Sequence, residues 1–158
     1  MPTVDVNIFD YASVSRATRR LDENYADLIE KANTVCERLA TIGAVRASLD
    51  FSRAIYNGTN DVAVTVEPID NGYAIHATGN AVLFIEFGSG ASYGYGHPEP
   101  EGYGPGTYPG KGHWDDPNGW WYGNHEHSYG NPPAQAMYNA KRDIQAEVQR
   151  IADEVFNT

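Results

Sequence analysis

The sequence has little of what a secreted, membrane-embedded or nucleic-acid-binding protein needs. Its 158 residues contain a single cysteine, Cys36, so an intrachain disulfide is excluded, as is typical of a reducing compartment. There is no apolar run of about 18 residues for a membrane span, and the N-terminus lacks the basic start and apolar stretch of a signal peptide. Lys and Arg number 11 against 21 Asp and Glu, and the resulting net charge of −10 argues against affinity for phosphates or for an anionic membrane.

Motifs of known catalytic sites are also scarce. Gly88-Ser89-Gly90 is one residue too tight for a Gly-x-Ser-x-Gly nucleophile turn. The Gly-Tyr-Gly runs at 94–96 and 102–104 lack the helix and the basic residue of a phosphate loop. Cys36 lies within an apolar stripe, where a thiol is packed and inert. The sequence therefore predicts no catalytic residue and no cofactor.

Histidines and carboxylates gather in one segment and raise two chemical alternatives. The candidate metal ligands are His97, His113, Asp115, Asp116, His125, Glu126 and His127. Thiolates are absent from this set, His-Glu-x-x-His does not occur, and Gly-rich flanks do not hold ligands rigidly, so we expect solvated or interface histidines and no metal site. A metal-dependent hydrolase that uses these groups, and a glycan-binding module that uses the tryptophans of the same segment, are the alternatives to a structural protein.

The first third of the chain is expected to be helical after a short strand. Val4, Val6 and Ile8 alternate with polar neighbours, as in a brief strand, and Asp10 or Ser13 is a suitable helix cap. Beyond them, apolar residues recur at intervals of three, four or seven positions: Val14, Leu21, Tyr25, Leu28, Ala32, Val35, Leu39 and Ile42. This spacing predicts a long amphipathic helix.

The predicted helix covers residues 11–42 and resumes through Arg53 after a kink at Gly43, because glycine costs about 1 kcal/mol within a helix. Charged residues occupy the face opposite to the apolar stripe. Such a stripe either packs on the chain's own sheet or forms a helix seam between subunits.

A β-hairpin is expected next. Apolar residues alternate with polar or small ones over 62–66 and again over 73–77, as half-buried strands require. Asp70-Asn71-Gly72 between them is a turn signal, because Asn and Gly tolerate a positive φ. His76 falls on the face opposite to the apolar side chains and is expected to be exposed.

Two further segments are expected to contribute to the core. Residues 81–87 are apolar on both faces except at Glu86, and they form either a central strand or a buried helical turn. Near the C-terminus, Asn131 is a suitable N-cap and Pro132 suits the first position of a helix. The helix that would follow has apolar residues at helical spacing: Met137, Ala140, Ile144, Val148, Ile151 and Val155.

Residues 88–130 form an unusual segment with neither a helical nor a strand period. It holds most of the 16 Gly, all three Trp and six of the 11 Tyr. The aromatic content argues against disorder, and each ring can bury roughly 150–250 Å². We expect this extended interaction loop to find its cover on another chain. The candidate subunit-interface residues are Trp114, Trp120, Trp121, Tyr122, Tyr103 and Tyr108.

These elements predict one α+β domain over residues 1–158. Its small antiparallel sheet is packed by a long N-terminal helix and a C-terminal helix, and the Gly- and aromatic-rich loop at 88–130 extends from it.

One run of the sequence resembles a known signature. Ala81-Val82-Leu83-Phe84-Ile85-Glu86-Phe87-Gly88-Ser89-Gly90 is similar to the "apolar–Val/Ile–Glu–Phe–Gly–Thr/Ser–Gly" motif of a tailed-phage morphogenesis family named after the tenth gene product of a lambdoid coliphage. Family members are encoded among head–tail joining and tail-completion genes. Nearly the whole chain is similar to members from phages of Gram-positive hosts, in particular the helix at 11–42, the hairpin start at 60–64, the turn at 71–73, the loop at 91–129 and the run at 132–140. The chain departs from the family at Tyr138-Asn139, where an Arg often precedes the Ala.

The resemblance implies a structural virion protein and not an enzyme. Such a protein forms a ring in the head–tail joining region, as a neck or connector component, or alternatively acts as a tail terminator or tail-completion protein. The implied partners are sister copies, with six-fold symmetry matching a tail and twelve-fold a portal, and other neck and tail proteins. Assembly would take place in the host bacterial cytoplasm and the product would reside in the virion, without membrane contact. DNA would pass without specific binding, since an acidic wall repels a polyanion.

Within the signature and the C-terminal run, Glu86, Phe87, Gly88, Gly90, Asn131 and Pro132 are expected to be structural. Gly88 and Gly90 would let the chain leave the buried segment at backbone angles that other residues resist. Glu86 either points outward or, if it is buried, needs an Arg or a backbone donor, because an unpaired buried carboxylate is very costly.

Overall fold

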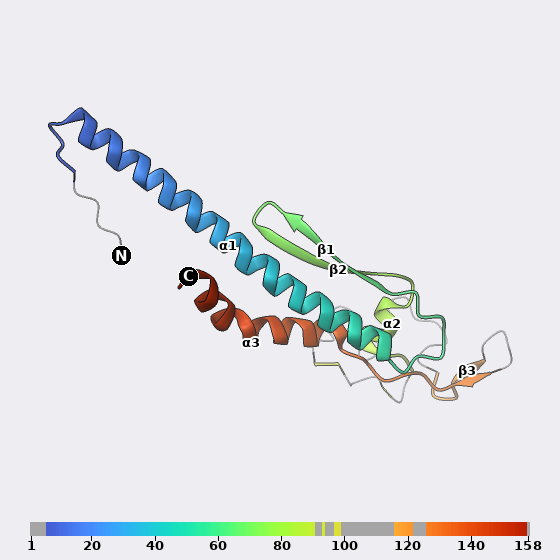
Figure 1. Ribbon diagram of the computed structural model, residues 1–158. Coiled ribbons are helices and arrows are strands. Elements are labelled where there is room, and N and C mark those ends of the chain that lie inside the picture. The colour runs from blue at the N-terminus through green and yellow to red at the C-terminus, as the bar shows by residue number, and fades with distance from the viewer. Residues whose placement is uncertain (1–5, 91–92, 94–96, 99–115, 122–125, 158) are drawn as a thin grey trace.

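The computed structural model describes residues 6–90, 93, 97–98, 116–121 and 126–157, and it has the predicted α+β architecture (Figure 1). The elements follow in the order α1 (Tyr11–Arg53), β1 (Ala63–Ile69), β2 (Gly72–Thr78), α2 (Val82–Phe87), β3 (Trp120–Trp121), β4 (His127–Ser128) and α3 (Ala136–Phe156). Within these described ranges, no helix combines the length and the apolar content that crossing a bilayer requires.

The chain enters α1 through a turn and not through the expected strand. Asn7 closes this turn, because its carbonyl accepts a hydrogen bond from the N–H of Asp10 and its side chain accepts one from the N–H of Phe9. The prediction of a strand is therefore wrong at Val6 and Ile8, and Val4 lies outside the described residues. Asp10 caps α1 as expected, with its carboxylate accepting the N–H of Ala12 at 3.1 Å.

Helix α1 continues through Gly43 to Arg53 without the predicted interruption. Gly43 is buried where α1, β2 and α3 meet: a Cβ atom there would lie 2.5 Å from Cδ1 of Ile144 and 2.7 Å from Cδ1 of Ile75. Glycine lowers the stability of a helix, but at position 43 this loss is offset by the close packing of Ile144 and Ile75. The packing explains why glycine occurs here without a kink in α1.

The two long helices are also joined by polar contacts. Arg46 of α1 pairs with Asp143 of α3 at 3.5 Å, and the side-chain amide of Asn139 donates to Asp50 at 2.8 Å. Further along, Arg38 pairs with Glu154 close to the end of α3. The half of α1 that precedes this pair extends beyond both α3 and the hairpin (Figure 1).

The hairpin has the predicted register. Strands β1 and β2 pair antiparallel from Ala63↔Thr78 to Ile69↔Gly72, which leaves Asp70-Asn71 as the connecting turn. The alternate side chains Val64, Val66, Ile75 and Ala77 are half-buried on one face. His76 is exposed on the other face, as expected, where its Nε2 lies 3.4 Å from a carboxylate oxygen of Glu67.

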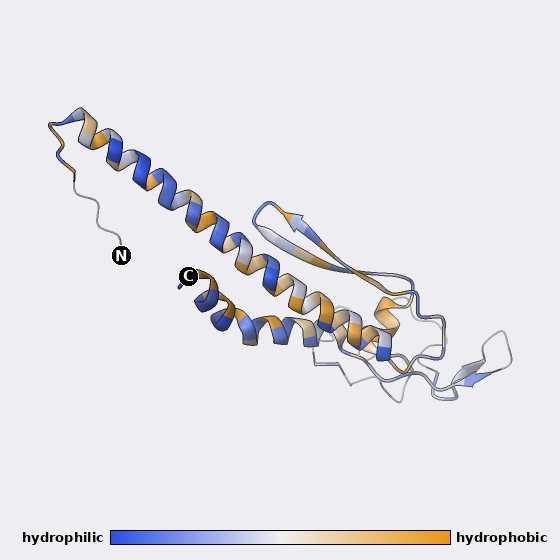
Figure 2. Cartoon of the chain, in the orientation of Figure 1, coloured by the Kyte–Doolittle hydropathy of each residue, from blue (hydrophilic) through white to orange (hydrophobic). Residues whose placement is uncertain are grey.

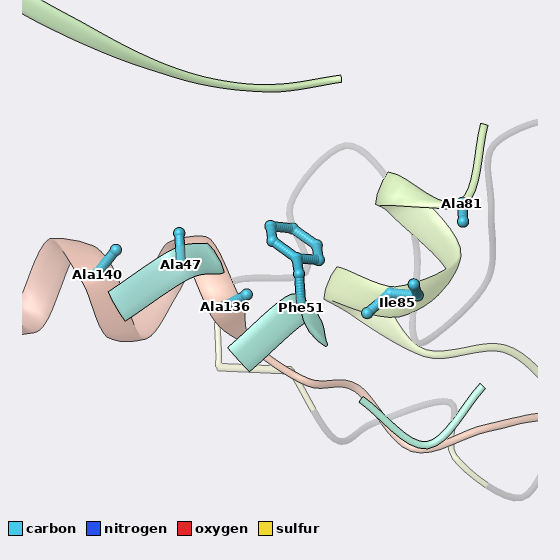
Figure 3. Packing of buried hydrophobic residues seen from close by; sticks show 6 residues of the cluster. All are labelled: Ala47, Phe51, Ala81, Ile85, Ala136 and Ala140. Carbon is cyan, nitrogen blue, oxygen red and sulfur yellow. The ribbon is translucent and has the colours of Figure 1, made fainter. Parts of the chain in front are cut away.

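The segment 81–87 is the buried helical turn, α2, and not a strand. It completes a small core with the C-terminal end of α1 and the start of α3 (Figure 3). Phe51 and Ile85 supply the bulk, and alanines supply the close contacts: Ala47, Ala81, Ala136 and Ala140. The core is thus concentrated at one end of α1.

Asp61 connects the hairpin to α2. Its carboxylate accepts hydrogen bonds from the backbone N–H groups of Asn80 and Ala81, at 2.8 and 2.9 Å, and from the side-chain amide of Asn80. These donors, led by the N–H of Asn80, hold the pKa of the Asp61 carboxyl below its ordinary value. Asp61 thereby fixes the entry into α2.

Replacing Gly43 by Leu should destabilise the protein by about 1–3 kcal/mol, because the added side chain overpacks the contact between α1, β2 and α3. Urea denaturation measures the change. Ala26→Leu, at an exposed position of the same helix, is the matched control and should change the free energy of unfolding by less than about 0.5 kcal/mol. Equal stability of the Gly43→Leu variant and the parent would contradict the close packing.

Asp61→Asn should lower stability most at neutral pH. Because the folded pKa of Asp61 is depressed, the ionised carboxylate stabilises the fold above its ordinary pKa, and this contribution is lost as the pH falls through the folded pKa. The difference in unfolding free energy between parent and variant should therefore shrink on acidification from neutral pH to about pH 3. A difference that is independent of pH over this range would refute the assignment.

Candidate functional site

The predicted signature meets the C-terminal run at one place, which we call the α2–α3 junction and define as residues 84–90 and 128–138. The backbones of Ser89 and Asn131 exchange two hydrogen bonds, at 3.0 and 3.1 Å, and their side chains also bond to each other. Both residues are buried. The two ends of the segment 88–130 are thus tied together at its base.

Glycine is required on both sides of this contact. Gly88 and Gly90 have φ values of +78° and +84°, as the sequence predicted, and Gly130 opposite them has a φ of +106°. A Cβ atom at Gly88 would lie 2.8 Å from the carbonyl oxygen of Asn131, and one at Gly130 would lie 1.9 Å from the carbonyl oxygen of Ser89. Only glycine allows the two chain segments to approach this closely.

The C-terminal run also satisfies the last carbonyl groups of α2. The side-chain amide of Asn131 donates to the carbonyl of Phe84 at 2.9 Å, and the N–H of Ala134 donates to the carbonyl of Ile85 at 2.7 Å. Both carbonyls belong to the last turn of a helix that ends at Phe87, where the regular helical hydrogen bonds run out. The junction therefore caps α2 with residues that lie far away in the sequence.

The predicted start of the C-terminal helix is wrong. Asn131 is not its N-cap and Pro132 is not its first residue, because α3 begins at Ala136. The side chain of Asn131 is engaged by Ser89 and Phe84, and Pro133 disfavours a helical conformation at the residue before it. Both residues belong to the junction and keep a structural role.

Glu86 supplies the missing cap of α3. Its carboxylate oxygens accept hydrogen bonds from the N–H groups of Met137 at 2.9 Å and Tyr138 at 3.1 Å, in the first turn of the helix. Gln135, at the N-cap position, has a left-handed backbone and makes no side-chain capping bond. A carboxylate at this end also interacts favourably with the helix dipole. Glu86 is thus buried and paired with backbone donors, one of the two arrangements that the sequence left open.

His97 is the second partner of Glu86. Its Nε2 lies 3.2 Å from Oε1 of Glu86, and the two side chains are only 4% and 6% exposed. The imidazole packs against the rings of Phe87, with centroids 4.4 Å apart, and Tyr138, with centroids 5.8 Å apart. The expectation of a solvated or intersubunit histidine is therefore wrong at His97. The burial of His97 beside Glu86 therefore attaches the segment 88–130 to α2 and α3 at a second place, in addition to the Ser89–Asn131 contact.

This arrangement holds the start of α3 in place. Both oxygens of Glu86 accept hydrogen bonds from backbone N–H groups of α3, so removal of the carboxylate would leave these donors without their acceptor. Among the described residues, no group of three or more His, Cys, Asp or Glu side chains could hold a metal ion. Of the candidate ligands, His113, Asp115 and His125 lie outside the described residues.

The predicted interface aromatics are found in different environments. Trp120 is 5% exposed and buried by its own chain, so its prediction as a subunit-interface residue is wrong. Its neighbour on the opposite face of β3, Trp121, is 69% exposed. The Trp121 ring packs edge-on against His127, and His127 against Tyr129, each with centroids 4.6 Å apart. The remaining candidates lie outside the described residues: Trp114, Tyr122, Tyr103 and Tyr108.

Sequence reasoning missed the pairing of His97 with Glu86 and the cap that Glu86 provides for α3. No local pattern could have found either contact, because capping signals are read from residues adjacent to the helix start and Glu86 precedes Met137 by 51 positions. No protein-family model, curated protein or solved structure matches the chain. The site is therefore interpreted from its own geometry.

Glu86→Gln should destabilise the protein by about 1–3 kcal/mol, because the amide has one acceptor oxygen for two backbone donors of α3. Glu67→Gln, which makes the same change on the exposed face of β1, should stay within about 0.5 kcal/mol of the parent. Urea unfolding followed by circular dichroism compares the two. Equal losses in both variants would show that Glu86 does not hold α3.

Proposed function

We propose that the protein is a non-enzymatic structural component of a tailed-bacteriophage virion, which forms a ring in the head–tail joining region through which DNA passes. The observation that carries this proposal is an apolar surface on α1 that the chain itself leaves uncovered. A tail terminator or tail-completion protein is the alternative within the same class.

This surface, the exposed stripe, consists of Val14, Leu21, Tyr25 and Leu28. Leu21, Tyr25 and Leu28 are 60%, 66% and 53% exposed. They lie on the N-terminal half of α1, which extends beyond α3 and the hairpin and on which apolar and hydrophilic positions alternate (Figure 2). The predicted stripe thus packs within the chain only toward the C-terminal end of α1. Contiguous exposed apolar surface on a protruding element is typical of a protein–protein interface.

The α2–α3 junction supports the same function. It fixes the base of the segment 88–130 by the Ser89–Asn131 contacts and by the Glu86–His97 pair. An interaction element that is anchored at its base loses less conformational entropy on binding than a free one does. Trp121 is exposed on this element, and tryptophan is enriched among residues that dominate binding energy.

Two features of the sequence connect this assembly role with the phage class. The run 81–90 resembles the signature of the morphogenesis family, and its Glu, Phe and Gly positions are the ones that build the junction. The net charge of −10 suits a wall past which DNA moves, because like charges repel and the polymer does not adhere.

The purified full-length chain should assemble into closed rings with a central channel. Light scattering measures the mass, and negative-stain electron microscopy shows the symmetry: six-fold for a tail component, twelve-fold for a portal-side component. A chain that stays monomeric at high protein concentration would contradict the proposal. Retention of such a monomer on immobilised glycans would favour the glycan-binding module instead.

A further inference from the structure

A second apolar surface lies elsewhere on α1. The C-terminal half of α1 and Val66 of the hairpin strand β1 border an open, shallow groove of about 580 Å³, which we call the α1–β1 groove. Its apolar walls are formed by Val45, Leu49 and Val66, and Val45 is 64% exposed. The small side chains of Ala44, Ser48 and Ser52 line it at intervals of four residues, the spacing along which one helix receives the side chains of another.

The exposed stripe cannot fill the groove of its own chain, because both are built on one uninterrupted helix. About 20 residues separate Leu28 from Ser48, which places them about 30 Å apart along the helix axis. At about 3.6 residues per turn, the two positions also lie on nearly opposite sides of α1. Any burial of the stripe in the groove must therefore take place between two copies of the chain.

Burial of apolar surface favours the same pairing. Two stripes that faced each other would leave both grooves empty, whereas a stripe in a groove covers both apolar surfaces.

We infer that the exposed stripe of one copy docks into the α1–β1 groove of the next copy, head to tail. Because the two surfaces differ and lie on opposite sides of α1, each copy binds one neighbour through its stripe and another through its groove. A contact of this kind generates a closed ring when the rotation between copies closes, and an open filament when it does not. The inference rests on the proposed assembly function and specifies the surfaces that carry it.

Mixed single-cysteine variants test the contact directly. In a Cys36→Ser background, Leu21→Cys or Leu28→Cys places a thiol in the stripe, and Ser48→Cys places one in the groove. Differently tagged stripe and groove variants are mixed and oxidised, and the cross-linked products are separated by mass. We expect disulfides between stripe and groove variants. Ala26→Cys, exposed on another side of the same half of α1, is the matched control and should give almost none.

Disulfides mainly between two stripe variants would overturn the inference, because they would indicate a symmetric helix pair. So would cross-linking no stronger than that of the Ala26→Cys control. If the unmodified chain forms rings and the stripe–groove disulfide is absent, the docking is wrong and the proposed ring stands. If the disulfide forms but microscopy shows open filaments, the docking is right and the ring is wrong.

A charge in the stripe gives an independent measurement. Leu21→Glu together with Leu28→Glu should raise the dissociation constant between copies at least about tenfold, since two apolar side chains lose their cover. Ala26→Glu adds the same kind of charge outside the stripe and should leave it unchanged. Circular dichroism confirms that each variant is folded. Unchanged assembly of the double variant would overturn the inference.

Discussion

The connection between α2 and the start of α3 depends on one carboxylate, that of Glu86. Helix α3 has no side-chain cap of its own, and α2 is too short to hold itself in place. Glu86 joins the two helices by its hydrogen bonds to Met137 and Tyr138, and it joins the Gly-rich segment to both through His97. Because the side chains of Glu86 and His97 are buried, each depends on these partners for its hydrogen bonds.

Features set by local rules could be predicted from the sequence. The hairpin register follows from alternation and from the turn at Asp70-Asn71, and the span of α1 follows from helical periodicity. The positive φ values of Gly88 and Gly90 were also predicted. What could not be predicted depends on contacts between distant segments. Asn131 has a side chain suited to capping a helix, but this side chain forms hydrogen bonds with Ser89 and with the carbonyl of Phe84. Tertiary contacts therefore decide where α3 starts.

Aromatic content alone did not separate buried from exposed rings. Trp120 and Trp121 are adjacent in the sequence, yet the pairing of β3 with β4 directs them to opposite faces. The ring of Trp120 therefore packs within its own chain, whereas the ring of Trp121 remains accessible to a partner. The same distinction applies along α1, where one continuous apolar pattern is covered near the core and uncovered beyond it (Figure 2).

The uncovered half of α1 has a consequence for when copies can associate. A helix without tertiary packing is only marginally stable in water, so this half should open locally at far lower free energy than the half beside α3. A newly made copy would then order its tip only upon meeting a neighbour, and each encounter would first have to offset that ordering entropy. The first contact between copies is then the slow step of association, and the contacts that follow it form on a helix that is already ordered.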